Sequence, residues 1–120
     1  MPRYVILQHD HPELHWDLML QAGDKLRTWR LAKAPIKPGE AIEATAIGDH
    51  RLMYLDYEGP ISGGRGRVVR WDQGNYEEEI SGIIGSDQRV VIGLVGKRVI
   101  GKAVLERVIG TQWSFQLKET

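Results

Sequence analysis

Three of the four histidines in this chain fall within seven residues, at His9, His11 and His15, and Asp17 follows two positions later. Imidazole is the commonest neutral metal ligand and the usual acid or base near neutral pH. Two imidazoles and a carboxylate can occupy one side of a metal ion and leave the other side open for water or substrate. The pattern therefore predicts that His9, His15 and Asp17 bind a metal ion or act in catalysis, with His11 as a bystander. Two surface histidines beside a turn are the alternative.

A second candidate group lies further along the chain, at His50 and Tyr54. Glycine and aspartate precede His50, so residues 48–51 are expected to form a loop. A histidine in such a loop can act as a general acid or contact a phosphate, or it can be an ordinary solvated side chain. The residue types alone leave both interpretations open.

Basic residues near glycines are candidate anion contacts, namely Lys33, Arg65 and Arg67. Glycines let backbone amides approach a phosphate, and arginine offers paired donors in a planar fork. Basic side chains in glycine-rich loops are also common on plain solvated surfaces. Taken alone, these basic residues are therefore a weak signal. We predict them as phosphate contacts because the same chain carries the histidine cluster.

Two predicted strands position the histidine cluster. Residues 3–9 and 15–20 are rich in β-branched and aromatic side chains, and Pro12 interrupts them. Alternation along the second strand places its histidine and aspartate on one face and the intervening apolar residues on the other, which we take as the core face. Pairing of the two strands as a hairpin brings His9 alongside that histidine.

The remaining chain predicts an all-β fold. Fourteen glycines in 120 residues, against an average near 7%, divide short runs of β-branched residues and leave no convincing amphipathic helix. About eight short strands in a small closed or nearly closed β-barrel satisfy this pattern and remove exposed sheet edges. We expect one domain over residues 1–120, an extended run at 52–57 and a turn at 72–75. The other expected strands are residues 26–31, 41–47, 67–71, 90–95, 98–108 and 113–117.

Composition excludes several classes of protein. The chain has no cysteine, which rules out disulfides and thiol catalysis, and its formal net charge of zero gives no global attraction to nucleic acid. No apolar run approaches the roughly 20 residues of a membrane span, and the first residues do not predict a signal peptide. We therefore expect a cytoplasmic protein with no membrane partner.

Several motifs together resemble the 3′-phosphoesterase domain of bacterial DNA ligase D. The likeness runs from about Tyr4 to the last strand, and the order and spacing of the motifs are more specific than any one of them. The motifs are His9-Asp10, Leu14-His15-Trp16-Asp17-Leu18, Thr28-Trp29, Lys33-Ala34-Pro35, Asp49-His50, Tyr54, Asp56-Tyr57-Glu58-Gly59 and Trp71-Asp72-Gln73-Gly74.

The resemblance implies a small barrel that uses a divalent metal, typically manganese with zinc or another transition metal as the alternative, to process 3′ ends in end-joining repair. The implied reactions are removal of a 3′-terminal ribonucleoside and then of the 3′-phosphate from DNA or RNA–DNA ends. A ligase or polymerase acting in trans is an implied partner, and we assume a monomer. The implied roles are metal ligands His9, His15 and Asp17, phosphate or leaving-group contacts His50 and Tyr54, and a phosphate contact Lys33.

One departure from the family pattern concerns the strand of the cluster. The family carries an arginine two residues beyond the metal-binding aspartate, and this chain has Met19 there. Arg3, Arg30, Arg65 and Arg67 are the candidate replacements, with the loop at residues 62–66 the first place to look. Met19 and the neutral net charge favour a first alternative function, a barrel that binds metal and DNA ends without turnover. A second alternative is a non-haem iron oxygenase, because His15, Asp17 and His50 together imitate a facial triad.

Overall fold

Nine strands and one short 3₁₀ helix make up the described part of the chain, which is residues 1–79 and 88–118 of a computed structural model. Runs of β-branched and aromatic residues between turns explain why strands dominate. The strands are β1 (Arg3–His9), β2 (His15–Ala22), β3 (Lys25–Leu31), β4 (Ala41–Arg51), β5 (Gly59–Pro60), β6 (Arg67–Glu78), β7 (Arg89–Gly96), β8 (Ile100–Ile109) and β9 (Gln112–Leu117), and the 3₁₀ helix η1 is Leu52–Leu55.

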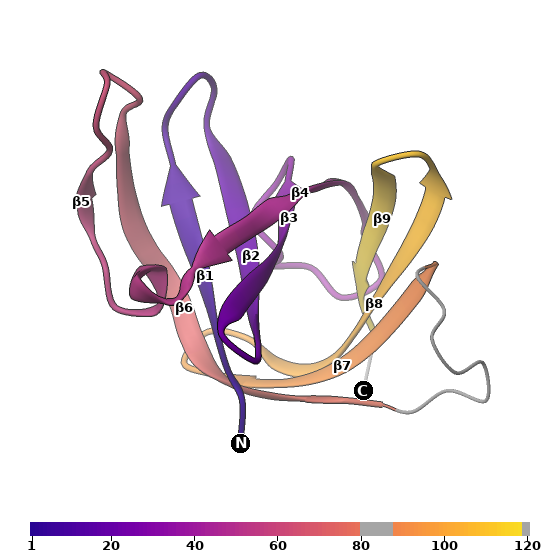
Figure 1. Cartoon of the computed structure of the whole chain (residues 1–120). Coiled ribbons are helices and arrows are strands. Elements are labelled where there is room, and N and C mark those ends of the chain that lie inside the picture. The colour runs from indigo at the N-terminus through magenta and orange to yellow at the C-terminus, as the bar shows by residue number, and fades with distance from the viewer. Residues whose placement is uncertain (80–87, 119–120) are drawn as a thin grey trace.

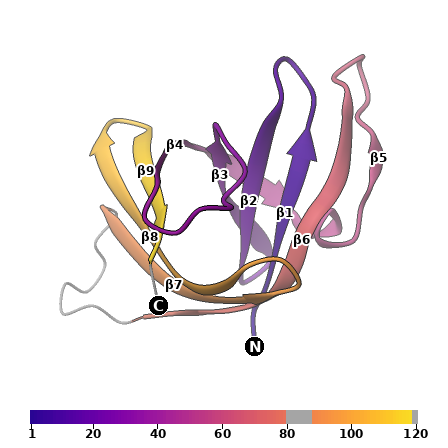
Figure 2. The same ribbon diagram turned by 180° about the vertical axis from the view of Figure 1, so that it is seen from behind.

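The strands close into an antiparallel barrel. Eight of them pair in the order β1-β2-β3-β4-β9-β8-β7-β6, and β6 pairs back with β1, while the short β5 adds to β6. Figures 1 and 2 show the β1–β2 hairpin standing beside the β5–β6 connection, with β7 crossing the base of the molecule. Closure leaves the barrel strands without an unpaired edge. The predicted small all-β barrel is confirmed.

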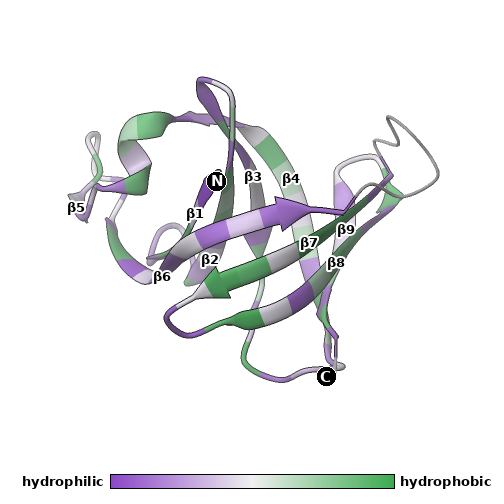
Figure 3. Ribbon diagram, turned by 90° about the horizontal axis from the view of Figure 1, so that it is seen from below, coloured by the Kyte–Doolittle hydropathy of each residue, from purple (hydrophilic) through white to green (hydrophobic). Residues whose placement is uncertain are grey.

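The barrel interior holds the main hydrophobic core, to which every barrel strand contributes. Leu18 and Leu20 of β2 lie in it, as alternation predicted, and Trp16 packs partly against it. Viewed from below, hydrophobic and hydrophilic residues interchange along strands such as β8 (Figure 3). The other core residues are Tyr4, Ile6, Trp29, Leu31, Ile42, Ala44, Tyr76, Val90, Ile92, Leu94, Val99, Ala103, Leu105, Trp113, Phe115 and Leu117.

A second, smaller cluster covers the opposite face of the wall formed by β1, β2, β3 and β6. Its strand residues alternate in sequence with those of the main core, so they point away from the barrel interior. The 3₁₀ helix and the segment after it close over this cluster. Its buried members are Val5, Leu7, Met19, Leu26, Leu55 and Val68, with Leu52, Tyr54, Tyr57 and Ile61 packed against them.

Strand β6 changes face half-way along its length. Ile6 pairs with Asp72 and Leu7 pairs with Arg70, so Trp71 is an extra residue that forms a bulge. Before the bulge, the even-numbered Val68 of β6 belongs to the outer cluster, and after the bulge the even-numbered Tyr76 belongs to the main core. The bulge therefore exchanges the faces to which even- and odd-numbered residues of β6 point.

Asp72 is the buried acceptor that joins β6 to the β7–β8 turn. Its two carboxylate oxygens accept hydrogen bonds from the Tyr4 hydroxyl at 2.7 Å and from the backbone N–H groups of Lys97, Arg98 and Val99 at 2.9–3.1 Å. Burial, with the hydrogen bond to the Asp72 carboxylate, raises the pKa of Tyr4. The hydrogen bonds of the Asp72 carboxylate are therefore satisfied within the protein, and its role is structural.

Three local predictions are wrong. Residues 48–51 continue β4, and residues 52–55 form η1 because this turn packs its leucines onto the outer cluster. The expected turn at 72–75 is continuous β6, in which Gly74 pairs with Gly96. A Cβ on Gly74 would lie 2.0 Å from a backbone oxygen of β7, so this glycine permits close strand approach rather than a turn.

Candidate metal centre and adjacent hollow

The predicted cluster is assembled at the end of the β1–β2 hairpin. His9 and His15 are paired across the two strands, and Asp17 lies two residues further along the same face of β2. Their possible ligand atoms all lie within 4.8 Å of one another. His15 and Asp17 are each 4% exposed, and His9 is partly buried. The hairpin register therefore brings together the three residues that the sequence singled out.

Backbone carbonyls fix the orientation of both imidazoles. His9 Nε2 lies 2.7 Å from the carbonyl oxygen of Arg65, and His15 Nδ1 lies 2.8 Å from that of Glu13. A carbonyl only accepts, so each of these nitrogens carries the donated proton. The lone pairs of His9 Nδ1 and His15 Nε2 remain, at 3.8 Å and 3.3 Å from Asp17 Oδ2.

This arrangement fits a divalent cation. His15 Nε2 is within hydrogen-bond distance of Asp17 Oδ2, so this nitrogen either carries a second proton on the ring or presents a lone pair to a bound cation. With neutral imidazoles, two ring lone pairs and a carboxylate oxygen converge, which is repulsive unless a cation lies between them. Donation of the other ring N–H to a carbonyl is the usual support of a metal-bound histidine. Asp17 Oδ1 is also buried without a hydrogen-bond partner in the part of the chain that the structure describes. A donor set of two nitrogens and one oxygen suits a transition metal better than calcium or magnesium.

The loop that supplies one of these carbonyls is tied to the end of β1. Asp10 Oδ1 accepts a hydrogen bond of 2.8 Å from the backbone N–H of Arg67. Gly66 has φ +75°, and a Cβ there would lie 2.2 Å from that same carboxylate oxygen. Glycine is thus required for the loop to reach Asp10, and this contact holds the Arg65 carbonyl against His9.

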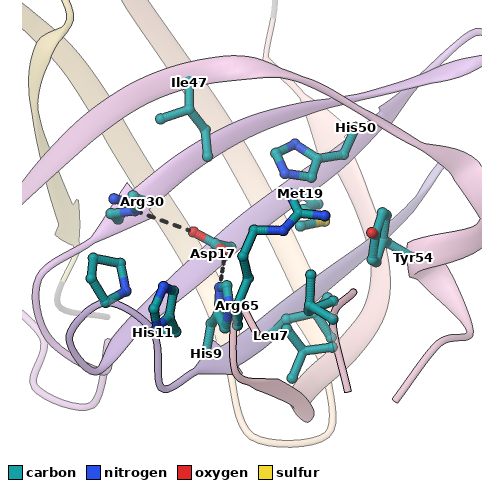
Figure 4. Close-up of a pocket in the computed structure, with 13 residues that line it drawn as sticks. Leu7, His9, His11, Asp17, Met19, Arg30, Ile47, His50, Tyr54 and Arg65 are labelled. Atoms are coloured by element: carbon teal, nitrogen blue, oxygen red, sulfur yellow. Dashed lines mark hydrogen bonds and ion pairs between the residues drawn. The ribbon is translucent and has the colours of Figure 1, made fainter. Parts of the chain in front are cut away.

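A hollow of about 250 Å³ opens beside the cluster on the outer face of the barrel. Figure 4 shows His9 and His11 on one side of it and His50 and Tyr54 on the other, with the Arg65 side chain between them. The lining is mixed, with apolar residues between the polar groups. The lining residues are Leu7, His9, His11, Pro12, Asp17, Met19, Arg30, Ile47, His50, Tyr54, Ile61, Arg65 and Val68.

A bulge places His50 on the wall of this hollow. Thr28 pairs with Ile47 but Leu26 pairs with His50, so β4 carries one more residue than β3 across this interval. Without the extra residue, residue 49 would pair with Leu26, and the histidine would point to the opposite face. The sequence predicted a functional histidine in a loop, whereas His50 lies at the end of a strand.

Tyr54, which η1 carries, also lines the hollow. The ring centroids of His50 and Tyr54 are 5.8 Å apart in an edge-on arrangement. His50 Nδ1 lies 2.9 Å from the carbonyl oxygen of Gly48, so this nitrogen donates and Nε2 remains for exchange with a ligand. The two residues predicted to act together are therefore neighbours.

The three predicted phosphate contacts differ in position. Arg65 lines the hollow, and its guanidinium donates to the carbonyl oxygen of Ser62 at 2.7 Å and to its hydroxyl at 3.2 Å. Arg67 and Lys33 are exposed and are not among the lining residues. Arg3, another candidate replacement, is engaged elsewhere in an ion pair of 2.8 Å with Asp56.

Arg30 is the residue that sequence reasoning undervalued. It pairs with Asp17 across the β2–β3 hairpin and lines the hollow. The sequence does contain a signal for it: Gly23, with φ +64°, makes a two-residue turn that fixes the register of the hairpin. Counting back from that turn places Arg30 opposite Asp17.

The fold and the cluster define a small closed barrel with a candidate metal centre on its outer wall. Residues 7–107 match the family described as the DNA Ligase D 3′-phosphoesterase domain. The chain belongs to this family. No helix in residues 1–79 and 88–118 is long and apolar enough to cross a membrane.

The similar curated proteins are far longer than this chain. A multifunctional non-homologous end joining protein LigD of Pseudomonas aeruginosa is 37% identical over 76 residues, which cover 60% of this chain and 9% of the relative. The Mycobacterium tuberculosis DNA repair protein LigD is 30% identical over 115 residues, covering 92% and 15% respectively. The Mycolicibacterium smegmatis LigD is also 30% identical, over 122 residues, covering 92% and 16%. The chain thus spans 9–16% of the length of these relatives.

Proposed function

We propose that this domain is a divalent-metal-dependent phosphoesterase that processes 3′ ends of DNA or RNA–DNA strands in non-homologous end joining. Removal of a 3′-phosphate or a 3′-terminal ribonucleotide is the proposed reaction. The observation that carries the proposal is the convergence of His9 Nδ1, His15 Nε2 and Asp17 Oδ2, with both imidazoles held by carbonyl oxygens. Membership of the 3′-phosphoesterase family supports the choice of substrate.

His9, His15 and Asp17 would hold the metal, for which manganese is the first choice and zinc the second. A bound divalent ion supplies Lewis-acid polarisation of a phosphoryl oxygen and lowers the pKa of a water molecule. The Arg65 and Glu13 carbonyls keep the two imidazoles in the ligating tautomer.

The far side of the hollow supplies proton transfer and charge stabilisation. His50 Nε2 is the position at which a proton can be given to the leaving oxygen or taken from water. The Tyr54 hydroxyl and the Arg65 guanidinium are donors for the oxygens on which negative charge develops. These roles follow from position on the wall of the hollow.

A barrel that binds metal and DNA ends without turnover is the second proposal. It is favoured by the apolar residues beside the cluster, since Leu7, Met19 and Val68 offer no donor to a developing negative charge. The oxygenase alternative has less support. It needs His50 beside His15 and Asp17, whereas the group of possible metal ligands among the described residues contains His9 instead.

The test is a release assay with manganese and a primer–template that ends in a 3′-phosphate. Wild-type protein should release phosphate, and chelation of the metal or the His9→Ala variant should abolish release. Wild-type protein that binds the ends tightly but releases nothing would favour the second proposal. Equal release by wild-type protein and His9→Ala would remove the first.

The relatives are multifunctional end joining proteins, and this chain matches only a small part of each. We propose that a ligase, and where needed a polymerase, acts on the ends that this domain prepares. Rejoining of 3′-phosphate ends by a ligase, with and without the domain, measures this dependence.

A further inference from the structure

Two buried polar atoms face each other at the edge of the candidate metal centre. Arg30 Nε lies 4.0 Å from Asp17 Oδ1, too far for a hydrogen bond. Neither atom has another hydrogen-bond partner in residues 1–79 and 88–118. Unpaired buried polar groups are costly, and a bound water, an ion or a ligand is the usual partner of such groups. The side chain of Asp17 is 5% exposed, so the unpaired carboxylate oxygen points into a closed corner of the site.

The far end of the Arg30 side chain reaches solvent at the boundary between two hollows. The side chain is 41% exposed. It lines the hollow that contains His50 and Tyr54 and also a second hollow of about 250 Å³ beside His15. Figure 4 shows Arg30 next to Asp17, on the side of the hollow away from Tyr54. A ligand at the metal centre is therefore within reach of its guanidinium from either side.

Arg30 and Arg65 are the two arginines that line the first hollow, and they differ in how much of the guanidinium is engaged. Arg65 already donates twice to Ser62. Arg30 makes one loose ion pair, and a cation bound at Asp17 would neutralise the charge that attracts it. Its planar fork then presents two terminal nitrogens to an anion.

We propose that Arg30 is the residue that binds the phosphoryl group at this centre, with Nε turned toward Asp17 and the terminal nitrogens donating to the phosphoryl oxygens. The inference rests on the proposed function and names the residue that gives the site its affinity for a phosphoester. No role in proton transfer is included. Arg30 acts by holding the anion beside the metal ligands.

Calorimetric titration of the full chain with inorganic phosphate, with and without manganese, tests this role. Arg30→Met should weaken phosphate binding by about 10- to 100-fold, and Arg30→Lys should weaken it less, because the charge remains while the paired donors are lost. Arg89→Met is the matched control, since Arg89 is an exposed arginine of β7 in a surface ion pair. It should bind phosphate within about twofold of wild type. Thermal unfolding of each variant shows that the fold is intact.

The proposal is overturned if Arg30→Met binds phosphate as tightly as wild type, if Arg89→Met loses as much affinity, or if wild type binds no phosphate. A separate titration with manganese alone reports on the metal centre. If Arg30→Met takes up manganese and binds phosphate as tightly as wild type does, the role of Arg30 is rejected and the proposed function is not. Absent manganese uptake rejects the metal-dependent function, while the metal-free phosphate titration still decides on Arg30.

Discussion

Two aspartates on opposite faces of the barrel wall are almost equally buried, and their surroundings differ completely. Asp72, 3% exposed, faces the interior and accepts four hydrogen bonds from Tyr4 and three backbone N–H groups. Asp17, 4% exposed, faces outward toward two imidazole nitrogens, and its Oδ1 has no hydrogen-bond partner in the described residues. Both oxygens of the Asp72 carboxylate have hydrogen-bond donors within the protein, whereas one oxygen of the Asp17 carboxylate has none among the described residues.

The difference separates a carboxylate whose hydrogen bonds are satisfied from one with an unpaired buried oxygen. Burying a carboxylate is costly unless hydrogen bonds or opposite charges compensate for lost hydration. The β7–β8 turn supplies that compensation to Asp72. For Asp17, the one hydrogen-bond contact among the described residues is His15 Nε2 at 3.3 Å, and His9 and His15, when neutral, are held by carbonyl oxygens in tautomers that turn acceptors toward it. A divalent cation is the ligand that would satisfy all three groups at once.

The largest expected effect comes from Asp17→Asn. Because a neutral amide replaces the charged ligand, manganese affinity and phosphate release should each fall by at least about 100-fold. Without metal, the free energy of unfolding should stay equal or rise by about 1 kcal/mol, because an uncompensated buried charge is removed. Isothermal titration and urea denaturation measure the two quantities. A metal-free Asp17→Asn variant less stable than wild type by more than about 2 kcal/mol would place Asp17 with Asp72 as a structural residue.

Asp72→Asn should show the reverse pattern. An amide NH₂ would face N–H or O–H donors where a carboxylate oxygen now accepts, so the free energy of unfolding should fall by about 3 kcal/mol. Manganese affinity of the folded fraction should not change. Urea denaturation and a manganese titration at low temperature test both statements. Loss of manganese binding with unchanged stability would contradict the assignment.

Tyr4→Phe removes one donor from Asp72 and should cost about 1.5–3 kcal/mol. The raised pKa of Tyr4 means that its stabilising contribution is complete below the ordinary tyrosine value, about pH 10, and is lost as the pH rises further, because the unfolded chain then releases the proton first. The variant should therefore lose less stability above pH 10 than wild type does. Tyr76, whose pKa burial also raises, keeps part of that dependence. Identical alkaline unfolding curves would show that Tyr4 makes no such contribution.

The smallest effect is expected from His11→Ala. His11 lines the hollow but does not belong to the group of possible ligands, so manganese affinity should stay within about twofold of wild type. This variant also serves as a histidine control for His9→Ala. A tenfold loss of manganese affinity would show that His11, in the β1–β2 connection, takes part in metal binding.

Much of the fold could be predicted from alternation and glycine content. Alternation in residues 15–20 separated the core face from the cluster face, and pairing with residues 3–9 brought His9 to His15. What alternation cannot predict is a change of face within one strand. The bulge at Trp71 and the extra residue before His50 depend on long-range pairing with β1 and β3, and no local sequence pattern encodes it.

The closeness of His9, His15 and Asp17 could be predicted from the sequence, but the surroundings of these residues could not. His9, His15 and Asp17 are close together in the sequence, so their types and spacing alone indicate a site. Arg30 is 13 positions from Asp17 and becomes its neighbour only through the register of the β2–β3 hairpin. The outer apolar cluster was also missed, because the 3₁₀ helix that covers it resembled an extended segment. Met19 is an example of a residue in this outer apolar cluster. It lies on the same face of β2 as His15 and Asp17, and its side chain is buried beneath the 3₁₀ helix.

Manganese titration of wild-type protein, followed by the electron paramagnetic resonance signal of the free ion, tests the central claim most directly. The account predicts one manganese ion per chain for wild type and for His11→Ala, and binding weaker by at least about 100-fold for Asp17→Asn. Wild-type protein that binds no manganese or zinc, or Asp17→Asn that binds as much as wild type, would contradict it.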